Sequence, residues 1–379
     1  MNPTRLFSRA LCCALLLLNG CNKTESPTTG GAQAKPGKKP RIAFITNAVD
    51  PFWNIAAAGV KAAAKEFDAD AEVHMPAKGL ADQVRIIEAQ LASGVDGIAL
   101  SPIDAKNQVG LINQACGVTK VITHDSDAPD SKRLCFVGMN NYAAGRAAGK
   151  LVKEVIPKGG KVMLFVGRLE TLNAQQRRQG IVDELLDRPA QALATLKIDP
   201  PGTPLAGALY TVVDTRTDND DRARAQANAE DAITAYPDLA CMVGLYAYNP
   251  PACLQALKAA KKNGAIKLVA FDEQDATLQG ILDGDIHGTV SQQPYQYGYQ
   301  SVKILAGLAR GDQSVLPKNN FLEVPIIQVR KDNAAAFRDE LKKIAVRTMS
   351  YRRDAEGQRK RESFPTISPC LLCASAPLR

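Results

Sequence analysis

Polar side chains that can hold a small hydroxylated molecule recur through this sequence, each set directly after a short apolar run. Carboxylates accept hydrogen bonds from hydroxyl groups, each charge-assisted bond contributing about 1.5–3 kcal/mol, and arginine donates to oxygen atoms. Aromatic residues beside them offer flat surfaces on which the apolar face of a sugar ring can lie. These residues are Thr46, Asn47, Asp50, Phe52, Trp53, Ser101, Asp104, Asp125, Ser126, Asp127, Asn173, Arg177, Asp218, Asp220, Tyr246, Asn249, Asp272, Glu273, Gln292 and Gln293.

Several of these residues also have a purely structural interpretation. Acidic residues after strands are common helix N-caps, so Asp104, Asp220 or Glu273 could satisfy the first amides of a helix instead of binding a ligand. Trp53 could be a core residue that covers a sheet, and Arg177 could be a solvated surface charge. Asp125 favours the binding interpretation more strongly, because three consecutive polar residues end a buried run there.

Motifs typical of catalysis and metal binding are absent from the sequence. It has no Gly-x-Ser-x-Gly elbow, no Gly-x-x-x-x-Gly-Lys-Ser/Thr phosphate loop and no His-Glu-x-x-His. His74, His124 and His287 stand singly, and Cys370 and Cys373 lack a second pair of zinc ligands. We therefore predict a binding protein and not an enzyme, with no metal and no cofactor.

Short β-branched runs alternate with longer amphipathic segments from residue 41 to about residue 344. This alternation is typical of parallel sheets covered by helices on both faces, where ligands bind beyond the carboxyl ends of the strands. A chain of 379 residues with 45% hydrophobic content is long enough for two packed bodies, so we predict two doubly wound α/β lobes. Expected strands are 41–46, 71–75, 97–100, 120–123, 134–137, 161–166, 208–213, 241–246, 267–271, 287–291 and 321–329. Expected helices are 53–67, 80–93, 104–116, 140–156, 172–187, 220–235, 251–263, 274–283 and 294–310, with an extra loop at 188–207.

The two ends of the chain differ in composition from its centre. Basic residues precede an apolar run too short to span a bilayer, which predicts a signal peptide over residues 1–20. This run ends in Leu-Asn-Gly-Cys, which resembles the lipobox of bacterial lipoproteins, and Cys21 is the predicted lipidation site; an ordinary secretory signal is the alternative. Residues 21–40 are then expected to form a lipidated, flexible tether, and the Arg-rich residues 345–379 a disordered tail.

The net charge of +8 lies in these two ends. Residues 1–40 carry +5 and residues 345–379 carry +4, which leaves −1 for residues 41–344. A nearly neutral centre lacks the concentrated basic face that a nucleic acid needs, so no nucleic-acid partner is predicted.

Four of the nine cysteines lie in the central part of the chain, at Cys116, Cys135, Cys241 and Cys253. An exported protein can form disulfides, and four cysteines allow three pairings. Burial as small apolar side chains is equally compatible with the sequence, which leaves the state of these thiols open.

An ordered set of short segments runs through residues 41–344. They are Asp50-Pro51-Phe52-Trp53, Leu100-Ser101-Pro102-Ile103-Asp104, Ile122-Thr123-His124-Asp125, Val137-Gly138-Met139-Asn140-Asn141, Arg177 with Gly180, Ala270-Phe271-Asp272, and Gly288-Thr289-Val290-Ser291-Gln292-Gln293-Pro294. Together they resemble the ribose-type family of periplasmic sugar-binding proteins. The resemblance implies a type I binding protein with two lobes joined by three crossings. Residues 41–139 and about 293–320 would form one lobe, and residues 140–292 and about 321–344 the other.

The resemblance also implies which residues contact the ligand in the cleft. Departures from the family pattern occur at Ser126, where the family often has Arg, at Asp50, where it often has Asn, and at Asp220, where it often has an aromatic residue. They favour a ligand with more hydroxyl donors, or an amine, over ribose itself. The implied contacts are Thr46, Asp50, Phe52, Trp53, Ser101, Asp125, Arg177, Asp220, Tyr246, Asp272 and Gln292.

The resemblance implies the extracytoplasmic solute-binding component of a sugar-type ABC importer, which closes on a monosaccharide or polyol and presents it to a membrane permease. We expect a monomer in the periplasm or at the cell surface, anchored to the membrane through lipid on Cys21. The alternative from another class is a ligand-sensing module that signals to a membrane receptor or kinase. The effector domain of a repressor is disfavoured because no helix-turn-helix precedes residue 41.

Overall fold

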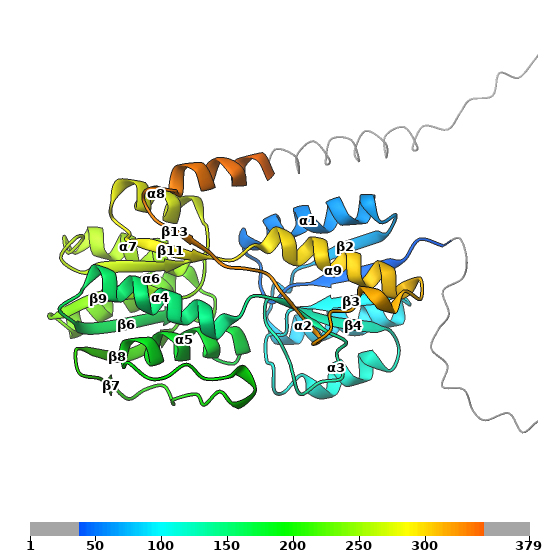
Figure 1. Ribbon diagram of the computed structural model, residues 1–379, viewed down its shortest axis with the longest axis horizontal. Helices are drawn as coiled ribbons and strands as arrows, with labels where there is room; N and C mark the ends of the chain where they lie inside the picture. Colours follow the sequence, from blue (N-terminus) through cyan, green and yellow to red (C-terminus); the bar gives the residue numbers. More distant parts are fainter. Residues whose placement is uncertain (1–37, 345–379) are drawn as a thin grey trace, which may run out of the picture. The chain divides into compact units, whose positions relative to one another are not determined.

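A computed structural model describes residues 38–344, which fold into two α/β lobes (Figure 1). The first lobe contains a six-stranded sheet in the order β12-β5-β4-β3-β1-β2, in which all neighbouring strands are parallel. Its strands are β1 (Arg41–Ile45), β2 (Asp70–His74), β3 (Gly97–Leu100), β4 (Lys120–His124), β5 (Phe136–Gly138) and β12 (Phe321–Glu323). Its helices are α1 (Phe52–Glu66), α2 (Leu80–Ala92), α3 (Val109–Cys116) and α9 (Pro294–Ala309), followed by the 3-10 helix η2 (Gln313–Val315).

The second lobe contains a seven-stranded sheet in the order β13-β11-β10-β9-β6-β8-β7. Its two outer pairs, β13 with β11 and β7 with β8, are antiparallel, and the other pairs are parallel. Its strands are β6 (Gly160–Val166), β7 (Leu205–Ala206), β8 (Tyr210–Thr217), β9 (Leu239–Gly244), β10 (Lys267–Phe271), β11 (Gly288–Ser291) and β13 (Ile327–Val329). Its helices are α4 (Asn141–Val155), α5 (Leu172–Leu185), α6 (Arg222–Ala235), α7 (Asn249–Ala259) and α8 (Asp275–Asp283), with the 3-10 helix η1 (Leu193–Thr195) in the extra loop and a last helix at 334–344.

The chain passes between the lobes three times. It leaves the first sheet after β5, returns after β11 into α9, and crosses again between β12 and β13. The two doubly wound lobes and the three crossings that the sequence predicted are confirmed. The predicted signal peptide, Cys21 and the tail at 345–379 lie outside the described residues.

The last crossing differs from its prediction in two ways. The single strand expected at 321–329 is two short strands in different sheets, because Pro325 between them has no amide hydrogen for a ladder bond. The lobe boundary expected at about residue 320 therefore falls after Glu323. The carbonyl of Pro325 accepts a hydrogen bond from Nε2 of Gln293 at 2.8 Å, which ties the second and third crossings together.

Both faces of each sheet are buried, because alternate side chains of a strand point to opposite sides. In β1, Ile42 and Phe44 pack on the face covered by α1 and α9, whereas Ala43 and Ile45 pack on the face covered by α2 and α3. In the second lobe, α4 and α5 cover one face and α6, α7 and α8 cover the other. Burying each large apolar side chain stabilises the fold by about 1.5–3 kcal/mol. The strand ends are therefore rigid positions from which loops carry polar residues.

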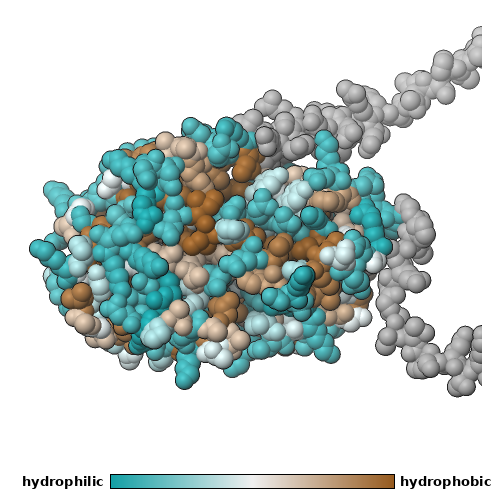
Figure 2. Space-filling model, viewed as in Figure 1, coloured by the Kyte–Doolittle hydropathy of each residue, from teal (hydrophilic) through white to brown (hydrophobic). Residues whose placement is uncertain are grey.

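The surface drawn in Figure 2 is largely hydrophilic, and its hydrophobic side chains show mainly near the middle of the view. Among residues 38–344, no helix is both long enough and apolar enough to cross a membrane. The same residues contain no group of three histidine, cysteine or acidic side chains arranged to hold a metal ion. Within this range the cysteines are free thiols, namely Cys116, Cys135, Cys241 and Cys253.

Helices α4 and α5 approach each other closely enough that only glycine fits at their contact. A Cβ atom on Gly145 would lie 2.1 Å from the carbonyl oxygen of Arg177, and one on Gly180 would lie 2.2 Å from the carbonyl oxygen of Tyr142. Real Cβ atoms do not approach backbone so closely, so a larger residue must push the helices apart. This contact sets the position of α5, the helix that carries Arg177.

We predict that Gly145→Ala lowers the free energy of unfolding by about 1–3 kcal/mol, because the added methyl group overpacks the α4–α5 contact. Gly110→Ala is the matched control: Gly110 lies in α3 with no atom within 4 Å of the Cβ position, so alanine should stabilise the protein by up to about 1 kcal/mol. Urea unfolding followed by circular dichroism measures both. Equal midpoints for the two variants would contradict the proposed overpacking.

Candidate functional site

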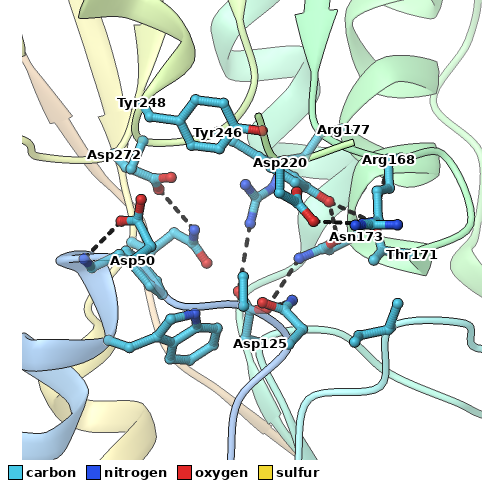
Figure 3. Close-up of a pocket in the computed structure, with 17 residues that line it drawn as sticks. Asp50, Asp125, Arg168, Thr171, Asn173, Arg177, Asp220, Tyr246, Tyr248 and Asp272 are labelled. Carbon is cyan, nitrogen blue, oxygen red and sulfur yellow. Dashed lines mark hydrogen bonds and ion pairs between the residues drawn. The ribbon is translucent and has the colours of Figure 1, made fainter. Parts of the chain in front are cut away.

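A cavity lies between the two lobes, beyond the carboxyl ends of their strands (Figure 3). It contains about 530 Å³ of space outside the atoms, part of it open to solvent. The first lobe contributes Asn47, Ala48, Asp50, Phe52, Trp53, Ile103 and Asp125 to its wall. The second lobe contributes Arg168, Thr171, Asn173, Arg177, Asp220, Tyr246, Ala247, Tyr248 and Asp272, and Gln292 lies at a crossing.

Most of the predicted ligand contacts line this cavity, but Thr46 and Ser101 do not. The hydroxyl of Thr46 donates to the carbonyl of Ala48 at 2.8 Å, and that of Ser101 donates to Oδ2 of Asp125 at 2.9 Å. Both residues are fully buried and lie outside the cavity wall, so their direct contact with a ligand stays a prediction. Ser101 acts on the cavity only through Asp125. The predicted residues in the wall are Asp50, Phe52, Trp53, Asp125, Arg177, Asp220, Tyr246, Asp272 and Gln292.

Three carboxylates in the wall belong to residues with left-handed backbone, just beyond strand ends. Asp125 follows β4 with a φ of 58°, and Asp272 follows β10 with a φ of 66°. Their amides extend the sheets by one more bond, to the carbonyls of Val137 and Val290 at 3.1 and 3.0 Å. Aspartate adopts this conformation more readily than most residues, and Asp220 shares it at a φ of 64°. The turn points each side chain into the cavity (Figure 3).

Arg177 lies at the centre of the wall, with only 1% of its surface exposed. Its Nε donates to Oδ1 of Asn141 and its Nη1 to the carbonyl of Leu245, both at 2.9 Å. The guanidinium carbon lies 5.2 Å from the ring centroid of Phe271. Nη2 makes no hydrogen bond within residues 38–344, and the nearest carboxylate oxygen, of Asp125, is 3.8 Å away. The alternative of a solvated surface charge is therefore wrong.

Asp125 is the first-lobe partner of this arginine. Its Oδ2 accepts hydrogen bonds from Ser101, from Nδ2 of Asn173 at 3.2 Å and from Nδ2 of Asn47 at 3.3 Å. Asn173 belongs to the second lobe, so this contact joins the lobes inside the cavity. Burial raises the pKa of Asp125, and the positive charge of Arg177 and the three hydrogen bonds oppose that rise.

Asp272 is held by a hydrogen bond from a residue of the second crossing. Its Oδ1 accepts a hydrogen bond from Nε2 of Gln292 at 2.7 Å, and Oε1 of Gln292 accepts one from the hydroxyl of Tyr297 at 3.0 Å. The next residue, Glu273, points away from the cavity and accepts a bond from the hydroxyl of Ser291 at 2.6 Å. Burial raises the pKa of both neighbouring carboxyl groups, and the charge of Asp272 raises that of Glu273 further. Glu273 is not a helix cap, contrary to one alternative from the sequence.

Asp50 has both oxygens engaged within the protein. Its Oδ1 accepts the backbone amide of Phe52 at 2.9 Å, at the start of α1, and its Oδ2 accepts Nη2 of Arg222 at 2.6 Å. Arg222 is the first residue of α6 in the other lobe. Burial raises the pKa of Asp50, and the amide and the arginine oppose this.

Asp220 is likewise matched by an arginine, within its own lobe. Its Oδ2 accepts a hydrogen bond from Nε of Arg168, whose Nη2 donates to the carbonyl of Asn219 at 3.1 Å. The N-cap of α6 is the neighbouring Asp221, whose side chain accepts two helix amides. The interpretation of Asp220 as a helix cap is therefore wrong, and its carboxylate lies in the cavity wall.

Aromatic residues form the first-lobe side of the cavity. Trp53 packs edge-on against Phe52, with ring centroids 4.9 Å apart, and against His124 at 5.6 Å. His124 stacks on Phe44 at 3.9 Å, and burial lowers its pKa to about 3, so it is neutral at physiological pH. Trp53 is only 3% exposed and belongs to the core of the lobe. The interpretation of Trp53 as a core residue is confirmed; it also lines the cavity, and its contact with a ligand stays a prediction.

Eight wall residues were missing from the predicted ligand contacts. Asn47 and Asn173 carry the signal used for the others, a polar residue after a strand, and Arg168 carries it too, two residues beyond β6. Tyr248 stands beside the predicted Tyr246. The apolar members have no distinguishing signal in the sequence. The eight are Asn47, Ala48, Ile103, Arg168, Thr171, Asn173, Ala247 and Tyr248.

A further carboxylate, Asp218, supports the wall from behind. The hydroxyl of Tyr248 donates to its Oδ1 at 2.5 Å, and Nδ2 of Asn249 donates to its Oδ2 at 2.8 Å. Burial raises the pKa of Asp218 to about 6, and the nearby charge of Asp220 adds to the effect, whereas the two hydrogen bonds oppose it.

We predict that Asp218→Asn changes the pH dependence of stability. A carboxyl group whose pKa is raised from 3.8 to about 6 on folding binds protons more tightly in the folded state. It therefore lowers stability progressively as pH rises from about 4 to about 6, by on the order of 3 kcal/mol in total. The Asp218→Asn variant has no carboxyl group at this position and so does not lose this stability as pH rises.

Urea unfolding at pH 4, 5, 6 and 7 measures the difference between the variant and the original protein. A hydrogen bond lost in the variant lowers its free energy of unfolding by the same amount at every pH. A change with pH in the stability difference between the two proteins therefore reports the carboxyl group alone. We expect this difference to move in favour of the variant as pH rises. A difference that stays constant from pH 4 to 7 would contradict the raised pKa.

Comparison with known proteins agrees with this architecture. The periplasmic binding protein domain family matches residues 42–313. The D-ribose/D-allose-binding protein of Pseudomonas aeruginosa is 25% identical over 336 residues, covering 85% of this chain and 98% of that protein. The ribose import binding protein of Escherichia coli is 25% identical over 243 residues, covering 63% of this chain and 72% of that protein.

A solved structure gives the same result. The ABC transporter solute-binding protein of Burkholderia graminis in complex with D-arabinose superposes with a TM-score of 0.70 at 28% sequence identity, covering 79% of this chain and 98% of that protein. The family match spans most of both lobes and includes all the residues that line the cavity. The chain therefore belongs to the ribose-type family of periplasmic sugar-binding proteins.

Proposed function

We propose that this protein is the extracytoplasmic solute-binding component of a sugar-type ABC importer, and that it closes on a monosaccharide or related polyol in the cavity between its lobes. The observation that carries the proposal is the buried Nη2 of Arg177, a charged donor without a hydrogen-bond partner in the described chain, set between carboxylates of opposite lobes. A buried donor without a partner costs about 1–3 kcal/mol, and more when it is charged. A ligand oxygen at this position would remove that cost.

A sugar hydroxyl matches this arrangement because it accepts and donates hydrogen bonds at once. It can accept from Arg177 and donate to Asp125 or Asp272, so that one ligand links both lobes. The ring of Trp53 provides a flat surface for the apolar face of a sugar. Ligands with several adjacent hydroxyl groups therefore use more of the wall than ligands with one.

The two carboxylates that depart from the family pattern are each paired with an arginine. Asp50 is paired with Arg222, and Asp220 with Arg168, so the two carboxylates that departed from the family pattern are neutralised within the protein. This removes the reason that the sequence offered for an amine. The unpaired donor and acceptors that remain, around Arg177 and Asp272, are suited to hydroxyl groups.

The relatives are consistent with this class of ligand. Those matched above are described as binding D-ribose, D-allose and D-arabinose, all of them neutral monosaccharides. The family match supports the proposal of binding without turnover, and the partner that we propose is the permease of the importer. Attachment to the membrane through lipid on Cys21 and a monomeric state complete the proposal.

Closure follows from the position of the contacts. A ligand that touches Asp125 in one lobe and Asp272 in the other binds the closed form in preference to the open form, and so shifts the population toward it. The permease would then recognise the closed arrangement of the two lobes.

We predict that a matching monosaccharide raises the melting temperature of the mature protein. At a ligand concentration 100 times Kd, the added stability is about 2.7 kcal/mol. D-ribose, D-allose, D-arabinose and other neutral pentoses and hexoses form the first panel, measured by thermal unfolding. Arg177→Lys and Asp272→Asn should abolish the ligand-dependent shift, because each removes a contact made directly to the ligand.

Arg178→Lys is the matched control for Arg177→Lys. Arg178 is the next residue and is also buried, but its guanidinium bonds to Thr215 and to the carbonyl of Asp199, away from the cavity. We expect it to lower the melting temperature while keeping the ligand-dependent shift. The site assignment fails if Arg177→Lys and Asp272→Asn respond to the sugar as strongly as the original protein. The proposed ligand class fails if no neutral sugar or polyol shifts the original protein.

A further inference from the structure

Two ion pairs join the lobes among the described residues, and they differ in their relation to the cavity. Arg177 and Asp125 both line it, so any change there also alters the ligand contacts. In the other pair, Asp50 lines the cavity but Arg222 does not. Arg222 can therefore be replaced without removing a wall residue.

The Arg222–Asp50 pair lies at the outer edge of the cavity. The side chain of Arg222 is 54% exposed, whereas that of Asp50 is 12% exposed. The carboxylate of Asp50 lines the cavity and bonds to an arginine that lies outside its wall, so the pair connects the cavity wall of one lobe with the exposed surface of the other.

Each partner also has a contact within its own lobe. Oδ1 of Asp50 is fixed by the amide of Phe52, at the start of α1. The guanidinium of Arg222 lies 5.4 Å from the ring centroid of Tyr248, and the hydroxyl of that tyrosine is fixed by Asp218. Because both side chains are already ordered, little conformational entropy is lost when the bond of 2.6 Å forms.

We propose that Arg222 is a latch: its ion pair with Asp50 stabilises the closed form from outside the cavity and so sets how long the ligand stays bound. This inference rests on the proposed function, since it assumes a ligand enclosed between the lobes. Arg222 is a positioning residue and makes no contact with the ligand. The pair forms only after the lobes have closed, so its loss should speed ligand release and leave association nearly unchanged.

The single tryptophan of the chain, Trp53, lies in the cavity wall and reports on binding without a label. Stopped-flow tryptophan fluorescence, with the sugar that gives the largest thermal shift, measures both rate constants. For Arg222→Gln at low ionic strength we expect ligand release to be about three- to tenfold faster and association to change by less than about twofold.

Salt provides a second readout, which a merely structural role would not reproduce. The latch is partly exposed, so added salt screens it. Release from the original protein should accelerate with salt toward the rate of Arg222→Gln, whose own rate should stay flat. Arg224→Gln is the matched control, because Arg224 is exposed on the same helix and none of the described residues forms an ion pair with it; it should release ligand like the original protein.

Equal release rates for Arg222→Gln and the original protein at low salt, or parallel salt dependences, would overturn the latch while leaving the proposed function intact. If no sugar binds the original protein, the proposed function fails, and small-angle scattering without ligand then tests the latch alone. A larger radius of gyration for Arg222→Gln than for Arg224→Gln would support it, and equal radii would reject it.

Discussion

A single buried guanidinium, that of Arg177, is the constraint on which the site depends. A charge with 1% exposure is tolerated only when most of its donors are satisfied, and two of its nitrogens bond to the protein while the third faces the cavity. The contacts that hold it come from α4, from the end of β9 and from the ring of Phe271. The close approach of α4 and α5 at glycines is thus what brings this charge to the middle of the cleft.

The other charges of the cavity are arranged around this centre in pairs. Asp50 and Asp220 each have an arginine as partner. Asp125 and Asp272 instead have Arg177 near them, and Arg177 also faces the cavity. Burial raises the pKa of Asp50, Asp125 and Asp272, which shows that the positive charges only partly compensate the loss of water. The outer pairs neutralise Asp50 and Asp220, and the inner groups retain hydrogen-bonding capacity.

Much of the fold and most of the wall could be predicted from the sequence, because both follow from local rules. Alternating strands and helices define the sheets, and a polar residue after a strand marks the edge where loops meet, as at Asp125 and Asp272. Arg168 also follows this rule but was not predicted, since an arginine in a loop is ordinarily a surface charge. The hydroxyl of Thr46 turns back to the carbonyl of Ala48, a contact that no pattern in the sequence indicates. The partner of Asp50 comes from 172 residues away, and no local pattern indicates it.

The left-handed backbone at Asp125 and Asp272 restricts how this cleft could acquire a new ligand. Apart from glycine, few residues other than aspartate and asparagine adopt this conformation without strain, and glycine would supply no acceptor. An evolutionary path to another substrate would therefore retain both positions and vary the neighbours. At residues with ordinary backbone, such as Arg168 and Tyr248, a substitution that changes the ligand would cause no backbone strain.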